Sequence, residues 1–211
     1  MKNSTIRILS VFLVLQLLMV FSCFPGNDCG PFDDIFYKVS QIQAINIDKT
    51  NSTDIHLQQW PDSSNVLLDH FAIAIVVEPD YFTSIKPRFH NPFLHEALAC
   101  SPPSPEPVES ISGIEIVSNA DFITHNGDTI PAGFPLNALF KTAKTLREGF
   151  PPQPLSAYLQ SNEAVPTDGT ASDFLFLTQA SAINQFHRFT VTYSLDNGNT
   201  FSATTNSIGI Y

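Results

Sequence analysis

Apolar and polar residues alternate with a period of two along much of the chain, which is the pattern of half-buried β-strands. The alternation predicts strands at 35–47, 66–77, 111–118, 173–179, 189–195 and 201–211. Both alternating faces are apolar between Phe71 and Val77, so we expect the strand at 66–77 to be central and covered on both sides. The last segment is predicted either as one strand or as two strands with a kink near Asn206.

Helical spacing and turn sequences are confined to short segments. Apolar residues recur at helical spacing over 136–145, which predicts a short helix there, and a further helical turn is predicted at 155–160. The sequence Asp196-Asn197-Gly198-Asn199 predicts a tight turn, because Asn-Gly readily supplies positive φ.

About seven short strands with this patterning predict a mainly β fold, an immunoglobulin-like β-sandwich with one or two short helices. The segment 101–107 contains four prolines and is predicted to be extended and stiff. It could mark a boundary between two domains or a crossing between two sheets of one domain. We favour the crossing, because neither half alone has enough strands for an independent sandwich. The sequence therefore predicts a single domain over 35–211.

Composition narrows the class of partner. Of the 211 residues, 43% are hydrophobic and only 14% are charged, so the chain is too apolar to be disordered as a whole. It carries 20 acidic and 10 basic residues, a formal net charge of −10. Phosphate recognition needs a basic face, so this balance argues against a nucleic-acid partner.

The first residues have the order of a secretory signal. Lys2 and Arg7 precede an apolar run at 8–21. As a helix this run spans about 21 Å, which is short of the ~30 Å hydrocarbon core of a bilayer. The run ends in Val20-Phe21-Ser22-Cys23, which resembles a bacterial lipobox.

The lipobox resemblance implies a lipoprotein signal peptide at 1–22, a diacylglycerol group on the Cys23 thiol and a tether at 23–34. The membrane is then a partner through the lipid anchor. A plain signal peptide cleaved nearby and an uncleaved anchor are the alternatives. An Asp directly after the lipidated cysteine would favour retention in the inner membrane, but this position is Phe24. We therefore expect the protein in the outer membrane, and the sequence does not decide between its periplasmic side and the cell surface.

Two further cysteines support an oxidising compartment. If Cys23 is lipidated, Cys29 and Cys100 remain as an even pair. We predict a disulfide between them, for which chain entropy gives about 4 kcal/mol of stabilisation. Two buried or unpaired thiols are the alternative.

Several short segments resemble a family of uncharacterised Bacteroidetes lipoproteins. They are the lipobox, the early extra cysteine, Ala-Cys-Ser-Pro-Pro at 99–103, the segment at 113–119 and Pro-Leu-Asn-Ala-Leu-Phe at 135–140. The resemblance implies an envelope location and a largely β fold. That family brings no known activity, so no catalytic residues are carried over.

The sequence contains only weak signals for a metal site. A metal-dependent hydrolase would use His90, His95 and Glu96, but their spacing is not H-E-x-x-H and Pro92 lies between the histidines. The loop from Asp121 to Asp128 is rich in the oxygen ligands that calcium requires, yet Asn, Asp and Gly serve turns for backbone reasons alone. We therefore predict no metal, no cofactor and no catalytic residues.

Two positions are candidates for an involvement with sugars, one through ligand binding and one through covalent glycosylation. Trp60 lies in a turn-rich segment, where an exposed ring could stack on a saccharide, and the alternative is that it fills the core. Thr129 lies between Asp128 and Ile130, and this triplet resembles the Bacteroidetes O-glycosylation motif.

We therefore expect an outer-membrane lipoprotein of the cell envelope with a non-catalytic binding or structural role toward an unknown protein or glycan partner. A carbohydrate-binding lipoprotein of a glycan-uptake system is the first alternative, and a metal-dependent hydrolase is the second. A binding protein would expose aromatic rings, a structural protein an apolar patch or an open sheet edge, and an enzyme a pocket with converging carboxylates or histidines.

Overall fold

The computed structural model of the chain describes residues 34–84, 104–168, 171–183 and 185–211. The chain divides into two compact units, one formed by 1–35 with 83–105 and the other by 36–82 with 106–211. Most of the first unit lies outside the described residues. So do the predicted signal peptide and lipidation site, the predicted Cys29–Cys100 pair and the His90–Glu96 segment, which stay predictions.

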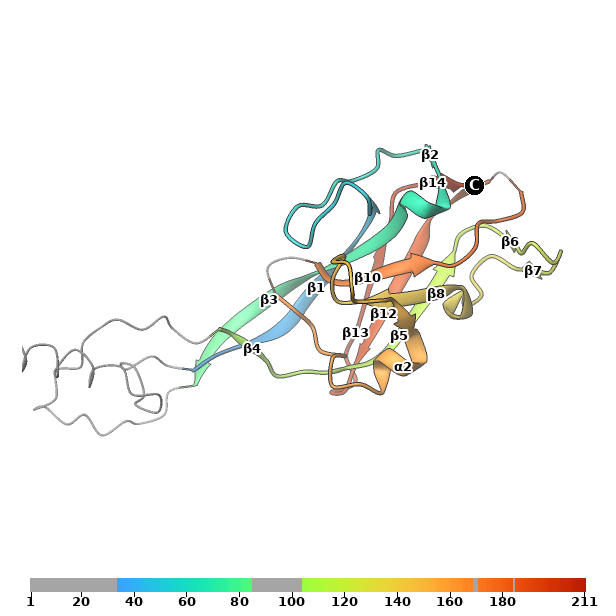
Figure 1. The fold of residues 1–211 in the computed structure, drawn as a ribbon. Helices are drawn as coiled ribbons and strands as arrows, with labels where there is room; N and C mark the ends of the chain where they lie inside the picture. Colours follow the sequence, from blue (N-terminus) through green and yellow to red (C-terminus); the bar gives the residue numbers. More distant parts are fainter. Residues whose placement is uncertain (1–33, 85–103, 169–170, 184) are drawn as a thin grey trace, which may run out of the picture. The chain divides into compact units, whose positions relative to one another are not determined.

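The described fold is mainly β, as the sequence predicts (Figure 1). The strands are β1 (Asp34–Asp48), β2 (Ser64–Val66), β3 (Phe71–Ser84), β4 (Glu106–Pro107), β5 (Ile111–Ser118), β6 (Phe122–Ile123), β7 (Thr129–Ile130), β8 (Phe140–Ala143), β9 (Gln153–Pro154), β10 (Ala171–Leu177), β11 (Phe186–His187), β12 (Phe189–Leu195), β13 (Thr200–Thr204) and β14 (Ile208–Ile210). The helical segments are the α-helix α2 (Leu155–Leu159) and two 3₁₀ turns, η1 (Leu68–His70) and η2 (Asn137–Leu139).

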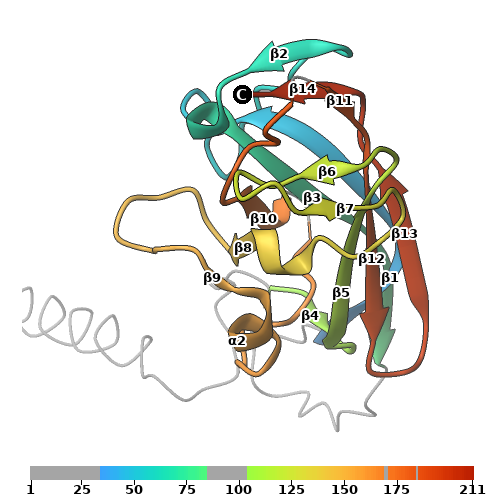
Figure 2. The same ribbon diagram turned by 90° about the vertical axis from the view of Figure 1, so that its right-hand side faces the viewer.

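The strands form sheets that pack into a sandwich. One layer is a six-stranded sheet in the order β4-β1-β3-β10-β8-β9. The opposite layer contains the three-stranded sheet β13-β12-β5, whose strands run side by side in Figure 2. A third sheet, β11-β14-β2, and the hairpin β6-β7 complete the described fold. The predicted β-sandwich with short helices is therefore confirmed.

The main core fills the space between the layers. It joins Ile73 and Ile75 of β3 to Ile116 of β5 and Val191 of β12, all of which are fully buried. Burying an aliphatic side chain of this size contributes about 1.5–3 kcal/mol. The alternation of apolar residues in these strands therefore places side chains between the layers, where their burial helps to hold the layers together.

The prediction for the strand at 66–77 is confirmed in its main point. β3 is an interior strand, and its residues from Phe71 to Ile75 are buried on both faces. Its isoleucines enter the main core, whereas Ala72 and Ala74 belong to a second, smaller core on the outer face of the same sheet. Leu57 and Leu146, from two loops, pack against this second core and cover it.

The prediction of a helix at 136–145 is wrong. Only the 3₁₀ turn η2 forms, and the chain then enters β8, which pairs antiparallel with β10. Phe140 and Thr142 of β8 are buried and Lys141 between them is exposed, so a short alternation of period two decides the structure. The strand expected from residue 66 also starts later, because η1 occupies 68–70.

The last segment of the chain forms two strands, β13 and β14, as one of the two predicted alternatives states. β12 and β13 pair across the predicted turn, where Gly198 has a φ of +87°. After β13 the chain leaves this sheet, and β14 pairs with β2 and β11 in another one. In the Pro-rich segment, Glu106 and Pro107 form β4 and pair in parallel with β1. No helix among the described residues is long and apolar enough to cross a membrane.

Candidate functional site

A pocket of about 340 Å³ lies where the loop after β8 meets the outer face of the six-stranded sheet. Its lining residues are Thr145, Leu146, Arg147, Glu148, Gly149, Phe150, Pro151, Pro152 and Phe176. Its volume is at the lower end of the usual range for small-molecule sites, roughly 300–1,000 Å³. We call it the Phe150–Phe176 pocket.

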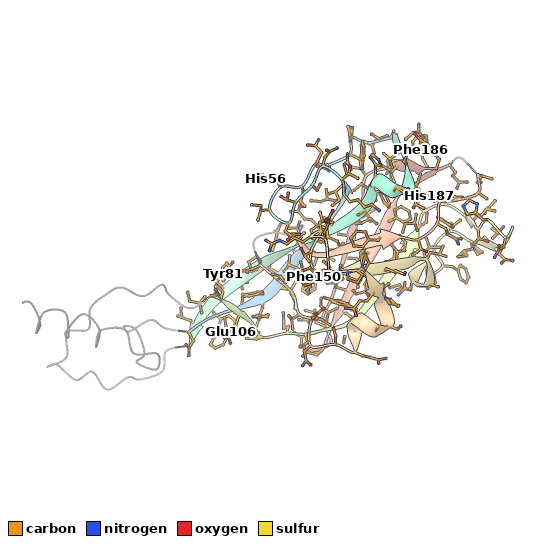
Figure 3. The ribbon with its side chains drawn as sticks, viewed as in Figure 1. His56, Tyr81, Glu106, Phe150, Phe186 and His187 are labelled. Atoms are coloured by element: carbon orange, nitrogen blue, oxygen red, sulfur yellow. The ribbon has the colours of Figure 1, made fainter. Side chains whose placement is uncertain are left out.

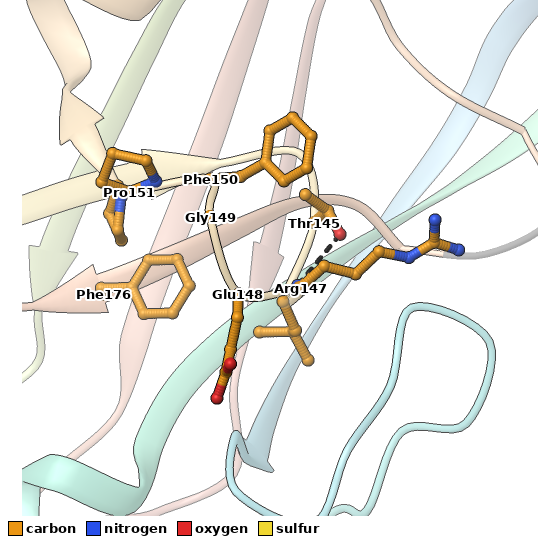
Figure 4. Close-up of a pocket in the computed structure, with 9 residues that line it drawn as sticks. Thr145, Arg147, Glu148, Gly149, Phe150, Pro151 and Phe176 are labelled. Carbon is orange, nitrogen blue, oxygen red and sulfur yellow. Dashed lines mark hydrogen bonds between the residues drawn. The ribbon is translucent and has the colours of Figure 1, made fainter.

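Two phenylalanine rings dominate the pocket. Phe150 is 63% exposed on the loop, whereas Phe176 stands on β10 and packs against the second core. The close-up shows the two rings on either side of the turn at Gly149 (Figure 4). One ring is therefore fixed by the sheet, and the other depends on the conformation of the loop.

The loop is held at its start and open at its tip. Asp54 accepts hydrogen bonds from the Thr145 hydroxyl (2.7 Å) and the Leu146 amide (2.8 Å), and its carboxylate lies 3.2 Å from Nε of Arg147. Gly149 has a φ of +92°, a conformation that side chains with a Cβ rarely adopt. The amides of residues 148–150 donate to no acceptor among the described residues. The tip therefore offers free backbone groups beside the two rings.

A second hollow of about 380 Å³ lies at another end of the molecule. It is lined by Leu67, Leu68, Asp69, His125, Ala180, Ser181, Ala182 and Tyr211. Four large apolar side chains on or near this hollow are more than 40% exposed: Leu67, Ile183, Phe186 and Tyr211. This hollow shares no lining residue with the Phe150–Phe176 pocket, so the two hollows are separate. Figure 3 likewise places Phe186 well away from Phe150.

The strongest electrostatic cluster lies inside the main core, where Asp173 is fully buried. Its carboxylate accepts hydrogen bonds from the hydroxyls of Tyr158 (2.5 Å), Tyr193 (2.7 Å) and Ser172 (3.0 Å). The Lys144 ammonium lies 3.1 Å from it and also donates to two backbone carbonyl oxygens. Every polar group of this cluster has a partner, so it is a satisfied buried network.

Burial shifts the pKa values in this cluster. It raises the pKa of both tyrosine hydroxyls, and the Asp173 carboxylate raises them further by disfavouring a second negative charge. Burial lowers the pKa of the Lys144 amine, although the same carboxylate acts in the opposite direction. These groups lie in a filled core and not in either hollow, so their position favours a structural role.

A second buried titratable group is His187, which is 1% exposed and packs between Phe122 and Phe189. Its Nδ1 lies 2.9 Å from the Ser118 hydroxyl, and its Nε2 has no partner among the described residues. Burial lowers its pKa, because a charged imidazole would lose its hydration between two aromatic rings.

The candidate sugar contact Trp60 lies against the core. Its ring is partly buried and packs on the main core cluster, and its Nε1 is buried with no acceptor among the described residues. This placement matches the alternative in which Trp60 fills the core. Because part of the ring stays accessible, the sugar contact at Trp60 stays a prediction.

Thr129 and the Asp121–Asp128 loop lie on the exposed hairpin β6-β7. Thr129 and Asp128 are both exposed, as a modification site requires, and glycosylation at Thr129 stays a prediction. Asp121 accepts a hydrogen bond from the Ala132 amide, as in an ordinary turn. Across the described ranges, no three His, Cys, Asp or Glu side chains gather closely enough to hold a metal ion.

Sequence reasoning missed the Phe150–Phe176 pocket and the Asp173 network. The only local signal for the pocket was an aromatic residue between Gly149 and two prolines. Its second ring comes from β10, and no local pattern announces that pairing. The Asp173 network also joins residues from four separate segments of the chain.

No protein-family model matches the sequence, and no curated protein matches it. Among solved structures, the chain is similar to one titled "BspA_C_mut" (12% identity, TM-score 0.25), covering 81% of this chain and 46% of that one. It is also similar to the C-terminal domain of the Streptococcus pyogenes antigen I/II-family protein AspA (9% identity, TM-score 0.25), with the same coverage. The chain thus spans about half the length of these structures, and similarity of this degree assigns it neither a family nor a function.

Proposed function

We propose that the chain is a lipid-anchored protein of the bacterial cell envelope whose β domain binds a ligand without transforming it. The lipobox-like sequence ending at Cys23 supports the anchor, and Phe24 after it supports the outer-membrane location. The observation that carries the binding role is the Phe150–Phe176 pocket, in which an exposed ring faces open space beside a ring fixed on a sheet.

The lining of the pocket fits recognition better than catalysis. A general acid and base need converging titratable groups, and the only acid in the lining is Glu148. The groups whose pKa values are shifted by core burial lie elsewhere, around Asp173 and His187. Exposed rings can instead stack on the apolar face of a sugar, so a glycan is the ligand class we favour.

A protein partner is the second candidate, and the hollow near Leu67 and Tyr211 favours it. Exposed large apolar residues gather around this hollow. Contiguous apolar surface of this kind is typical of protein–protein contact. A structural role in an envelope assembly would use this end of the molecule and leave the Phe150–Phe176 pocket free.

A glycan array with the purified full chain tests the binding role. We expect wild-type protein to bind at least one glycan, and Phe150→Ala to lose that binding because the exposed ring is removed without disturbing the core. Phe134→Ala is the matched control, since Phe134 is 59% exposed but does not line the pocket. Equal loss in both variants, or no binding by wild type, would contradict the proposal and favour the protein partner.

A further inference from the structure

Positive charge gathers around Phe176 in a chain that is acidic overall. Nζ of Lys49 lies 5.8 Å from the centre of the Phe176 ring. Lys141 is the direct cross-strand partner of Phe176 in the pairing of β8 with β10, so both side chains stand on the same face of the sheet. Lys141 is exposed and has no ion-pair partner in the described part of the chain.

The neighbouring acids do not cancel this charge. Asp54 is engaged by Arg147, and the guanidinium of Arg147 extends away from the two rings (Figure 4). Glu148 is then the single acid that lines the pocket, and Lys49 and Lys141 lie beside Phe176 outside the lining. The two lysines therefore bring positive charge to the Phe176 edge of the pocket, although the chain carries twice as many acids as bases.

The pocket also offers both kinds of hydrogen-bonding group. The exposed Glu148 carboxylate is an acceptor, and the free amides of residues 148–150 are donors. A saccharide hydroxyl both donates and accepts, and a pyranose ring presents an apolar C–H face that stacks on an aromatic ring. Rings, mixed hydrogen-bonding groups and nearby lysines together match a sugar that carries a carboxylate.

We propose that the Phe150–Phe176 pocket binds an acidic saccharide of the uronic acid class, and this inference rests on the binding role proposed above. The sugar ring stacks on Phe150 and Phe176, and its carboxylate faces Lys49 and Lys141. Glu148 and the loop amides bind the hydroxyls. An acidic peptide fits less well, because it would bring its charge to Glu148 without hydroxyl groups to offer that carboxylate.

The test is a calorimetric titration of the full chain with tri-galacturonic acid and with its neutral methyl ester. We expect the acid to bind at least tenfold more tightly than the ester, and high salt to remove that difference. Lys141→Gln should weaken binding of the acid about tenfold and leave the ester unchanged. Lys38→Gln is the matched control, since Lys38 is an exposed lysine of β1 whose ammonium lies over the Phe82 ring and not beside Phe176.

The outcomes separate this inference from the proposed function. Equal affinity for the acid and the ester, lost in Phe150→Ala, would overturn the charge preference and keep the binding role. Displacement of the acid by poly-glutamate of equal charge would overturn the saccharide class. An effect of Lys38→Gln equal to that of Lys141→Gln would show nonspecific attraction and overturn the site. Binding of no glycan, neutral or acidic, would remove the proposed function as well.

Discussion

Asp173 shows how one residue organises the interior of the sandwich. A fully buried carboxylate is costly unless its charge and its lone pairs are satisfied. Three hydroxyls and the Lys144 ammonium meet that requirement, and they come from β10, α2, β12 and the end of β8. The same four contacts therefore fix the positions of α2 and β12 relative to the six-stranded sheet.

Replacing this carboxylate should destabilise the fold strongly. We expect Asp173→Asn to lower the free energy of unfolding by about 3–5 kcal/mol, because it leaves the Lys144 ammonium without its counter-charge. Urea denaturation of both proteins measures the difference. Asp196→Asn, at an exposed turn, should change the same quantity by less than about 0.5 kcal/mol. Similar values for the two variants would show that the network contributes little.

His187 should make stability depend on pH in a defined window. Its pKa is lowered in the folded chain, so the unfolded chain binds a proton first as the pH falls. Stability is therefore complete above the unfolded pKa of about 6.5 and falls below it, by up to ~1.4 kcal/mol per pH unit. Unfolding measured between pH 7.5 and 5.5 should show this loss in wild type and a flatter profile in His187→Gln. Identical profiles would exclude His187 as the cause.

The hairpin β12-β13 is the element in which sequence and structure agree best. Its strand residues alternate, and Thr190 and Thr192 of β12 bond the hydroxyls of Thr204 and Ser202 on β13. The Asn-Gly turn between the strands was predictable, because only a few residues accept positive φ.

A substitution in this turn should weaken the element. Gly198→Ala places a Cβ at a φ of +87°, and we expect a loss of about 1–2 kcal/mol in the free energy of unfolding. Gly113→Ala in β5 is the control, because the added Cβ meets only an ordinary contact at 3.4 Å with Ser194 and φ there is not positive. Thermal unfolding of the two variants gives the comparison, and a Gly198→Ala protein as stable as wild type would contradict the argument.

Elements with strong local patterns were predictable, and elements decided by distant partners were not. β5 and β12 alternate clearly and appear at their predicted bounds. β8 is too short to show a clear period, and its pairing with β10 overrides the helical spacing around it. The Phe150–Phe176 pocket failed to appear in the sequence for the same reason, since it exists only after that pairing.

At the scale of the whole molecule, the proposed lipid anchor at Cys23 predicts that the protein stays on a membrane. Two or more acyl chains hold a protein on a membrane, because each buried CH₂ contributes about 0.8 kcal/mol. We expect the chain to incorporate labelled palmitate and to sediment with outer membranes. Cys23→Ser should abolish both, and Cys29→Ser should change neither. A Cys23→Ser protein that still carries the label would refute lipidation at this residue.

The position of β14 sets a condition on the order in which the chain can fold. β14 lies between β2 and β11, so neither of these strands has its neighbour in that sheet until residues 208–210 have been synthesised. Pairing β14 with β2 closes the long stretch of chain between these two strands, and such a closure costs chain entropy and is slow. A chain that crosses a membrane leader-first would therefore keep this sheet open during export, and it would complete the sheet only after translocation.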